Sequence, residues 1–271
     1  MADSTVRIGL VLPDVMGTYG DGGNAVVLRQ RLLLRGIPAE IVEVTLSDPV
    51  PAELDLYTLG GAEDYAQRLA TKHLIRYPGL QQAVSRGAPV LAICAAIQVL
   101  GRWYETSAGE RVDGVGLLDL VTAPQPVRTI GEVVSQPLVD GFSEPLTGFE
   151  NHRGGTVLGS SAEPLGRVTR GAGNRAGDGF DGAVQDSVVA TYMHGPCLAR
   201  NPALADLLLS RVVGKLPRLN LDEVALLRRE RLTARRRATE LHSLLAQPKM
   251  KRRKGNTARP IWRPAGWQAA R

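Results

Sequence analysis

Short apolar runs alternate with amphipathic stretches along the N-terminal part of the chain. The runs are bounded by glycine or proline, which is typical of buried β-strands, and Gly36 follows the first amphipathic stretch as a helix stop. Strands that alternate with helices imply parallel βαβ units, whose ligands bind beyond the carboxyl ends of the strands. The pattern predicts strands at residues 6–12, 37–44, 54–59 and 89–93, and helices at 24–35 and 62–86.

The pattern changes in the second half of the chain. From residue 114 to about 185, short apolar runs are broken by glycine and proline, which predicts strands and loops with few long helices. Residues 171–182 are so rich in glycine that we expect a flexible connector there. A strand at 188–193 and a surface helix at 202–216 follow. We therefore expect one α/β domain over residues 1–221 and a basic tail at 222–271.

Charge is divided unevenly along the 271 residues. Residues 228–271 hold 14 Lys and Arg against two Glu, a net charge of +12, whereas residues 1–227 have a net charge of −6. The folded body is therefore acidic, and we expect no nucleic-acid partner. Two cysteines are too few for a disulfide framework, and the sequence has neither a signal-peptide pattern nor a membrane-spanning run, so a cytoplasmic location is predicted.

The basic tail is predicted to be helical over 222–245 and disordered beyond it, because its sequence offers little to bury. A solvated tail without a specific role is one interpretation. Contact with anionic lipid at the inner face of the plasma membrane is another, since positive charge at Lys251–Lys254 is combined with Trp262 and Trp267. Docking to a partner protein is the third.

Cys94 lies where the apolar run 89–93 meets a stretch of small residues, so we expect it at a turn from a strand into a helix. The unpaired N–H groups at the start of a helix favour a thiolate over a thiol, and they can also hold a developing oxyanion. A buried structural cysteine that acts as a small hydrophobe is the alternative. The local pattern leaves both interpretations open.

His194 directly follows the strand predicted at 188–193, so in a parallel sheet it lies at the same edge as Cys94. A thiol beside an imidazole is the minimum apparatus for acyl transfer. Gly60 and Gly61 follow a third strand, and their backbone, together with the N–H of Ala95, would form an oxyanion hole. The alternatives are a histidine that only caps a strand and an ordinary strand-to-helix turn.

Five motifs together resemble the class I glutamine amidotransferase domain in its cobyric-acid-synthase-like (CobB/CobQ) branch. Within that branch the chain is similar to the GatD family, the glutaminase subunits of lipid II isoglutaminyl synthase. The resemblance covers about residues 5–215, and it implies a flavodoxin-like three-layer α/β fold with a mostly parallel central sheet. The motifs that carry it are Leu12–Asn24, Gly60–Asp64, Cys94 with Gln98, Gly148–Gly155 and Tyr192–Pro196.

The resemblance also implies roles for individual residues. Cys94 would attack the side-chain amide of L-glutamine to give a glutamyl thioester and ammonia, and His194 would be the acid–base partner. Arg128 and Gln98 would bind the substrate, since a guanidinium can hold both oxygens of an α-carboxylate; a solvated surface arginine is the alternative for Arg128. Asn151 and His152 would form the edge of the site, with His152 as the reserve base. No metal site is expected.

Two departures from the common class I pattern stand out. Ala92 and Ala96 replace the glycines that often flank the nucleophile at two residues' distance, so the turn is expected to be tightly packed. Pro196 stands where many of these enzymes have a glutamate that completes a triad. The resemblance therefore implies a Cys–His dyad whose activity depends on a partner that arranges the site.

Ammonia released without an acceptor is wasted, so a synthetase partner is implied. The resemblance makes this partner MurT, a Mur-ligase-like subunit that would bind ATP and Mg²⁺ and amidate the D-glutamate of lipid II to D-isoglutamine in a heterodimer. The chain itself has no GxxxxGK[ST] loop, and we expect no cofactor in it. The alternatives are an ammonia-supplying subunit of a cofactor pathway of the cobyric-acid type, a catalytically silent binding subunit and a cysteine peptidase.

Overall fold

The computed structural model describes residues 5–232 of the chain. These residues fall into two compact units, one that ends at Leu221 and one that begins at Asp222. Residues 222–232 are helical, which covers the start of the helix predicted at 222–245. The rest of that helix and the predictions for the remainder of the tail lie outside the described residues.

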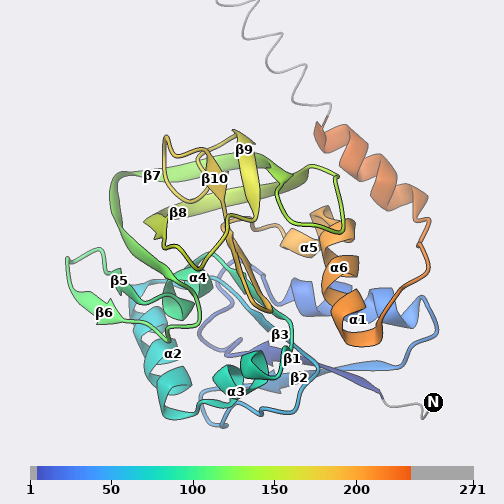
Figure 1. Ribbon diagram of the computed structural model, residues 1–271, viewed down its shortest axis with the longest axis horizontal. Helices are drawn as coiled ribbons and strands as arrows, with labels where there is room; N and C mark the ends of the chain where they lie inside the picture. The colour runs from blue at the N-terminus through green and yellow to red at the C-terminus, as the bar shows by residue number, and fades with distance from the viewer. Residues whose placement is uncertain (1–4, 233–271) are drawn as a thin grey trace, which may run out of the picture. The chain divides into compact units, whose positions relative to one another are not determined.

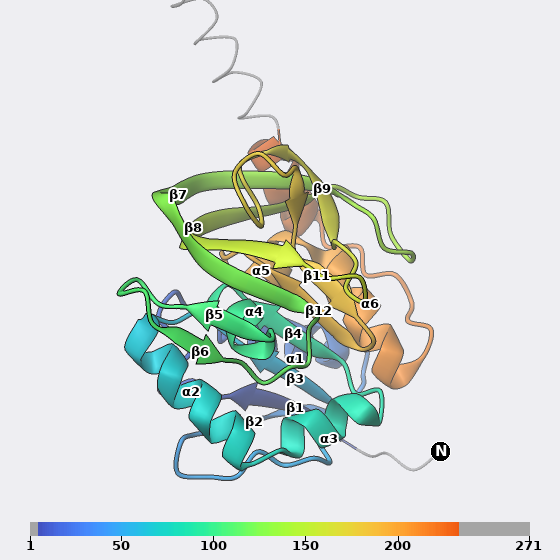
Figure 2. The same ribbon diagram turned by 60° about the vertical axis from the view of Figure 1, so that its left-hand side comes forward.

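A six-stranded sheet forms the centre of the first unit (Figure 1). Its strands lie in the order β11–β12–β4–β3–β1–β2 (Figure 2). Five of its strands run parallel, and only β11 at one edge is antiparallel to its neighbour. The α/β fold with a mostly parallel sheet is thus confirmed. The strands are β1 (Val6–Val11), β2 (Ala39–Val44), β3 (Leu56–Leu59), β4 (Val90–Ile93), β11 (Ala183–Gln185) and β12 (Val188–Thr191).

Crossover connections that run in opposite directions along the sheet place helices on both of its faces. The chain passes from β1 to β2 through α1 (Gly23–Leu33) toward one edge, and from β3 to β4 through α2 (Asp64–Arg76) and α3 (Gly79–Ser85) toward the other. Figure 2 shows α2 and α3 in front of the sheet and α1 behind it. The strand order reverses between β1 and β3, which is where ligands bind in open parallel sheets.

Pro78 divides the helical region predicted at 62–86 into α2 and α3. Proline has no N–H to donate, and it disfavours helical backbone at the residue before it. The helix predicted at 202–216 is α6 (Pro202–Val213), which follows the short α5 (Cys197–Arg200). It buries one apolar face, formed by Leu204, Ala205, Leu208 and Leu209.

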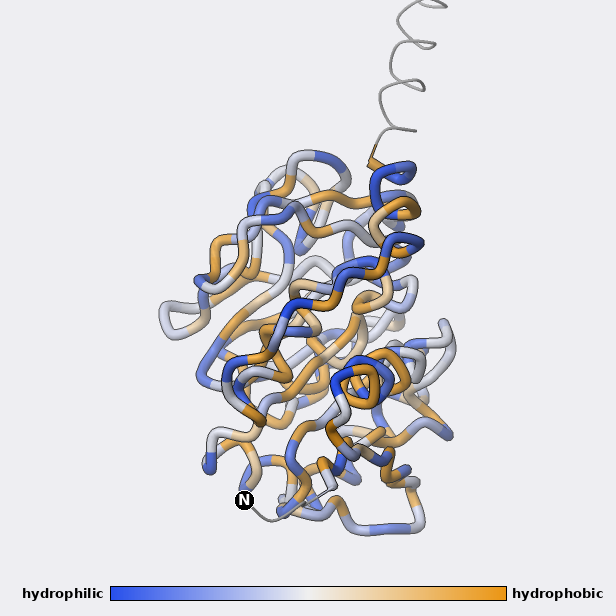
Figure 3. Tube along the Cα trace, turned by 90° about the vertical axis from the view of Figure 1, so that its right-hand side faces the viewer, coloured by the Kyte–Doolittle hydropathy of each residue, from blue (hydrophilic) through white to orange (hydrophobic). Residues whose placement is uncertain are grey.

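The core lies around the central strands. Every residue of β3, β4 and β12 is buried, which agrees with their largely apolar sequences. The hydropathy colouring in Figure 3 places long apolar stretches in the interior and hydrophilic stretches mainly at the periphery. No helix in the described part of the chain is long and apolar enough to cross a membrane.

A second sheet is built from the middle of the chain, as its short apolar runs predict. The long strand β7 pairs with β8 along most of its length, and the pairing is shifted between Pro124 and Thr129. Phe149 of β8 also forms a β-bridge with His194, so the second sheet is joined to the end of β12. The strands are β5 (Trp103–Glu105), β6 (Arg111–Asp113), β7 (Leu120–Pro137), β8 (Leu146–Leu158), β9 (Gly166–Arg170) and β10 (Phe180–Asp181).

The glycine-rich segment 171–182 is not the flexible connector that its composition predicts. The buried Glu150 carboxylate accepts hydrogen bonds from the N–H groups of Ala172 and Gly173, each at 2.8 Å. The side chain of Asn174 bonds to both the carbonyl and the N–H of Gly182, at 2.8 and 2.7 Å. Buried polar side chains therefore hold this loop in place, and composition alone does not reveal them.

Candidate active site

Cys94 occupies a strained turn between β4 and α4 (Ala95–Leu100). Its backbone has φ 54° and ψ −109°, which is unfavourable for a residue with a side chain and is typical of functional turns. The N–H of Cys94 donates to the carbonyl of Thr191 in β12 at 2.9 Å, and Cys94 is only 5% exposed. Ala92 and Ala96 are both fully buried. The tightly packed strand-to-helix turn predicted from the sequence is confirmed.

His194 lies at the same edge of the sheet as Cys94, as the sequence predicts. Strand β12 runs parallel to β4, and its last residue, Thr191, pairs with Ile93, which directly precedes Cys94. The backbone of His194 exchanges hydrogen bonds with Phe149, at 2.9 Å for its N–H and 3.1 Å for its carbonyl. Two sheets therefore fix the position of His194, which is 4% exposed.

Asp21 is a site residue that the sequence analysis did not single out. Its two carboxylate oxygens each lie 3.1 Å from Nδ1 of His194, and its side chain is fully buried. An ionised carboxylate only accepts hydrogen bonds, so Nδ1 carries a proton and donates it. Asp21 belongs to the Leu12–Asn24 motif, where a short acidic side chain between glycines is also typical of a turn.

The pKa of His194 is raised to about 10. Burial alone lowers it, but hydrogen bonds with Asp21 and Cys94 and the charges of both groups outweigh the burial. The second ring nitrogen, Nε2, is buried and has no hydrogen bond of ordinary geometry within the described residues, so its interaction with the Cys94 side chain is a looser one. The imidazole is therefore protonated near neutral pH, with Nε2 available to the thiol.

The Gly60–Gly61 loop has to be glycine because other site residues pack against it. A Cβ on Gly60 would lie 2.3 Å from the carbonyl oxygen of Met16, and one on Gly61 would lie 3.0 Å from Cε1 of His194. The N–H of Gly61 donates to Oδ2 of Asp21 at 2.9 Å, so this donor is already engaged. The oxyanion role of Gly60, Gly61 and Ala95 stays a prediction.

A cavity of about 400 Å³ opens beside Cys94. Arg128 lies on its wall in the irregular part of β7, where Nε donates to Oδ1 of Asn151 at 2.7 Å and Nη2 donates to the Tyr19 hydroxyl at 3.2 Å. The Tyr19 ring packs against His194 with the ring centres 4.8 Å apart. Gln98, Asn151 and His152 also line this cavity, so the structure brings the predicted substrate-binding and edge residues together around the thiol.

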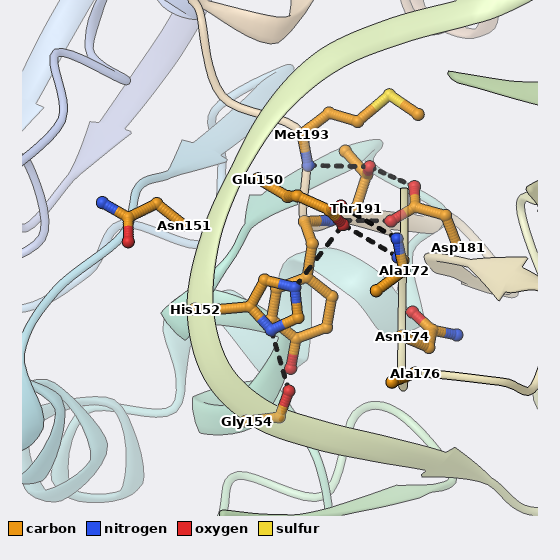
Figure 4. A network of polar contacts seen from close by, with 12 residues as sticks. Glu150, Asn151, His152, Gly154, Ala172, Asn174, Ala176, Asp181, Thr191 and Met193 are labelled. Carbon is orange, nitrogen blue, oxygen red and sulfur yellow. Dashed lines mark hydrogen bonds and ion pairs between the residues drawn. The ribbon is translucent and has the colours of Figure 1, made fainter. Parts of the chain in front are cut away.

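His152 is held by a buried polar network (Figure 4). Its ring stacks on Tyr192 at a centre-to-centre distance of 3.8 Å, and Nδ1 donates to the carbonyl of Gly154 at 2.8 Å. Its nearest acidic partner is Glu150, 3.8 Å from Nε2. The position of His152 on the cavity wall agrees with a residue at the edge of the site. The buried Asp21 carboxylate is paired with His194 and not with His152.

Thr191 connects the nucleophile turn to the same network. Its carbonyl accepts the N–H of Cys94, while its hydroxyl donates to Asp181 at 2.5 Å and accepts the N–H of Met193 at 3.1 Å. Asp181 is fully buried, which raises the pKa of its carboxyl group to about 6. Thr191 thus fixes the backbone of Cys94 and the backbone of Met193, the residue before His194.

Metal chemistry has no evident site within residues 5–232. No group of three or more His, Cys, Asp or Glu side chains in that range could hold a metal ion. The two cysteines, Cys94 and Cys197, are both free and buried.

Comparison with known proteins agrees with the fold. The sequence model of the CobB/CobQ-like glutamine amidotransferase domain matches residues 7–202, and the chain belongs to this family. The glutaminase domain of CTPS from Trypanosoma brucei, solved with bound acivicin, has the same fold, with a TM-score of 0.51 and 11% identity over 80% of this chain and 97% of that domain. The predicted enzyme class, a glutamine amidotransferase, is confirmed.

Two curated relatives within the family carry one name. The GatD subunit of lipid II isoglutaminyl synthase (glutamine-hydrolyzing) from Staphylococcus aureus is 37% identical over 74% of this chain and 81% of its own length. The GatD subunit from Streptococcus pneumoniae is 32% identical over 74% of this chain and 78% of its own length. The resemblance to the GatD family drawn from the motifs is confirmed.

Proposed function

We propose that this chain is the glutamine-hydrolysing subunit of a lipid II isoglutaminyl synthase. The observation that carries the proposal is the strained Cys94 turn beside a buried imidazolium, at the wall of a cavity that also presents Arg128. The similarity to two GatD subunits over most of their length supports lipid II as the acceptor of the ammonia. The proposal gives the chain L-glutamine as its substrate and ammonia as the product that it passes on.

The reaction proceeds through a thioester. The Cys94 thiolate attacks the γ-carbonyl carbon of glutamine, and the C=O electron pair moves onto oxygen to form an oxyanion. The N–H groups of Ala95 and Gly60 stabilise this oxyanion, while the Gly61 N–H stays bonded to Asp21. His194 donates the Nε2 proton to the leaving nitrogen, so ammonia departs as the C–N bond breaks. Nε2 then takes a proton from water, which attacks the thioester carbon and releases glutamate and the thiolate.

Arg128 and Gln98 hold the substrate in this proposal. The guanidinium of Arg128 is fixed by Asn151 and Tyr19 and still lines the cavity, so it can pair with the α-carboxylate. Gln98 donates weakly to the Tyr192 hydroxyl, at 3.4 Å, and presents its amide near the thiol. Asn151 and His152 complete the edge.

Arg128→Ala is expected to raise the KM for glutamine about tenfold or more with a smaller change in kcat, because a charged hydrogen-bond pair to the substrate is lost. Steady-state release of glutamate measures both constants. Arg153→Ala is the matched control, since Arg153 also lines the cavity and also donates from Nε, to the carbonyl of Gln125 at 2.9 Å, but the proposal gives it no contact with the substrate. Equal effects of the two substitutions would contradict the assignment of Arg128.

Gly61→Ala is expected to lower kcat about tenfold or more, because displacement of catalytic groups by fractions of an ångström is costly. The new Cβ would lie 3.0 Å from Cε1 of His194 and 3.4 Å from Oδ2 of Asp21, so the imidazole has to move. Gly22→Ala is the control, because its Cβ would meet only the Leu10 side chain at 3.5 Å. Unchanged kcat in Gly61→Ala would show that the close contact is not needed.

The ammonia acceptor lies on a partner in this proposal. A MurT-like Mur-ligase subunit binds ATP and Mg²⁺, activates the α-carboxylate of D-glutamate in lipid II, and receives ammonia to give D-isoglutamine. The heterodimer therefore works in the cytoplasm, at the inner face of the plasma membrane, where its lipid substrate lies. Contact of the basic tail with anionic lipid agrees with this location.

Release of glutamate and ammonia from glutamine tests the proposal. The chain is assayed alone and copurified with its Mur-ligase-like partner, in the presence of ATP, Mg²⁺ and lipid II. We expect stoichiometric glutamate and ammonia from the complex. A complex that amidates lipid II from ammonium salts but releases no glutamate from glutamine would overturn the proposal.

A further inference from the structure

Asp21 connects the imidazole of His194 to the Gly60–Gly61 loop. Its Oδ2 lies 3.1 Å from Nδ1 of His194 and also accepts the N–H of Gly61 at 2.9 Å. We propose that Asp21 is the positioning residue of the site: it orients the His194 ring and, through a shared oxygen, fixes the glycine loop beside Cys94. This inference rests on the proposed glutaminase function.

The loop that carries Asp21 is built rigidly against the segment that follows His194. The side chain and N–H of Asn24 donate to the carbonyl of Asp21, at 3.0 and 2.9 Å. The same side chain accepts the N–H of Leu198 at 2.9 Å. On the other side, a Cβ on Gly23 would lie 2.4 Å from Cγ of Pro196, so the two segments touch. The distance between Asp21 and His194 is therefore set by backbone on both sides.

Charge makes the two side chains depend on each other. The Asp21 side chain is fully buried, and His194 is its one cationic partner in the described part of the chain. A buried carboxylate without a partner is costly, so the pair stabilises the imidazolium as well as the carboxylate. The hydrogen bond with Asp21 is accordingly a main reason why the pKa of His194 is raised.

The contact with Asp21 also determines the tautomer of His194. Because Asp21 accepts from Nδ1, the proton that is exchanged during the reaction is confined to Nε2, which faces the thiol. The sequence predicts a dyad, since Pro196 occupies the position of the usual glutamate. In the structure, a carboxylate 173 residues earlier in the chain reaches the imidazole instead.

Asp21→Asn tests the inference because it keeps the shape of the side chain and removes its charge. In the copurified complex we expect kcat for glutamine hydrolysis to fall about a hundredfold with KM changed about threefold or less, since the orienting acid of a triad acts on the chemical step. Asp119→Asn is the matched control: Asp119 is also buried and bonded, to Ser161 and Arg102, but lies outside the site. It should retain wild-type kcat.

Titration of His194 by NMR separates a positioning role from a merely structural one. The full chain is labelled at its four histidines, in a Cys94→Ala background that removes the coupled thiol. We expect the titration midpoint of His194 to fall by about one unit or more on Asp21→Asn, because removal of the carboxylate destabilises the imidazolium. This readout needs no glutaminase activity, so it remains informative if the proposed function fails.

Asp21→Glu covers the case in which Asp21→Asn does not fold. It keeps the charge, so the His194 midpoint should stay within about one unit of the wild-type value, while the longer side chain misplaces the ring and kcat falls about tenfold or more. Wild-type kcat in Asp21→Asn, or an unchanged titration midpoint of His194 in that variant, would overturn the inference. If only Asp21→Glu folds, wild-type kcat in Asp21→Glu would overturn it.

Discussion

Cys94→Ala is expected to abolish glutamine hydrolysis, with a loss of kcat on the order of 10⁶-fold, which brings the rate near background. Among the described residues that line the cavity, no other nucleophile is held at a strained turn beside an imidazolium. Alanine removes only the sulfur, and the buried turn can retain its backbone. Glutamate release by the purified complex measures the loss, and a melting curve checks the fold.

Cys197→Ala is the control for that substitution. Cys197 is fully buried, burial raises the pKa of its thiol to about 12, and its sulfur lies 3.6 Å from Nδ2 of Asn201. It is therefore an unreactive structural cysteine, and its loss should leave kcat unchanged. Hydrolysis that survives in Cys94→Ala and disappears in Cys197→Ala would reverse the assignment of the nucleophile.

His194→Gln is expected to lower kcat on the order of 10⁴-fold, because a thiol without its acid–base partner can neither protonate the leaving nitrogen nor activate water. Glutamine keeps a polar side chain at the position, so loss of packing is limited. The remaining hydrolysis should rise with pH, because hydroxide then has to replace the water that His194 activates against the thioester. Initial rates between neutral and alkaline pH measure this slope.

His152→Gln distinguishes the two histidines of the site. His152 lines the cavity but is stacked on Tyr192 and bonded to Gly154, so we expect its loss to lower kcat about tenfold or less. A larger loss in His152→Gln than in His194→Gln would make His152 the base, the reserve role that the sequence left open.

The sequence predicts the sheet edge well because local pattern carries that information. Largely apolar runs mark β3, β4 and β12, and parallel pairing then brings the residues after them, Gly60, Cys94 and His194, to one edge. Each of these inferences needs only strand type and direction, which neighbouring residues determine.

Contacts between distant segments are what the sequence does not reveal. Asp21 reaches His194 from the loop after β1, and an aspartate between glycines is equally typical of a turn. The segment 171–182 has the composition of a linker, yet one buried carboxylate, Glu150, accepts two of its N–H groups. In both cases a polar side chain gains its role from a partner far along the chain, which composition and spacing do not encode.

Transfer of labelled nitrogen tests the central claim most directly. The copurified complex is given lipid II, ATP, Mg²⁺ and glutamine labelled with ¹⁵N in its side-chain amide, together with unlabelled ammonium, and the stem peptides are analysed by mass spectrometry. The account predicts ¹⁵N in the new amide of D-isoglutamine with the wild-type chain and only ¹⁴N with Cys94→Ala. Labelled amide formed by the Cys94→Ala complex, or unlabelled amide alone formed by the wild type, would contradict it.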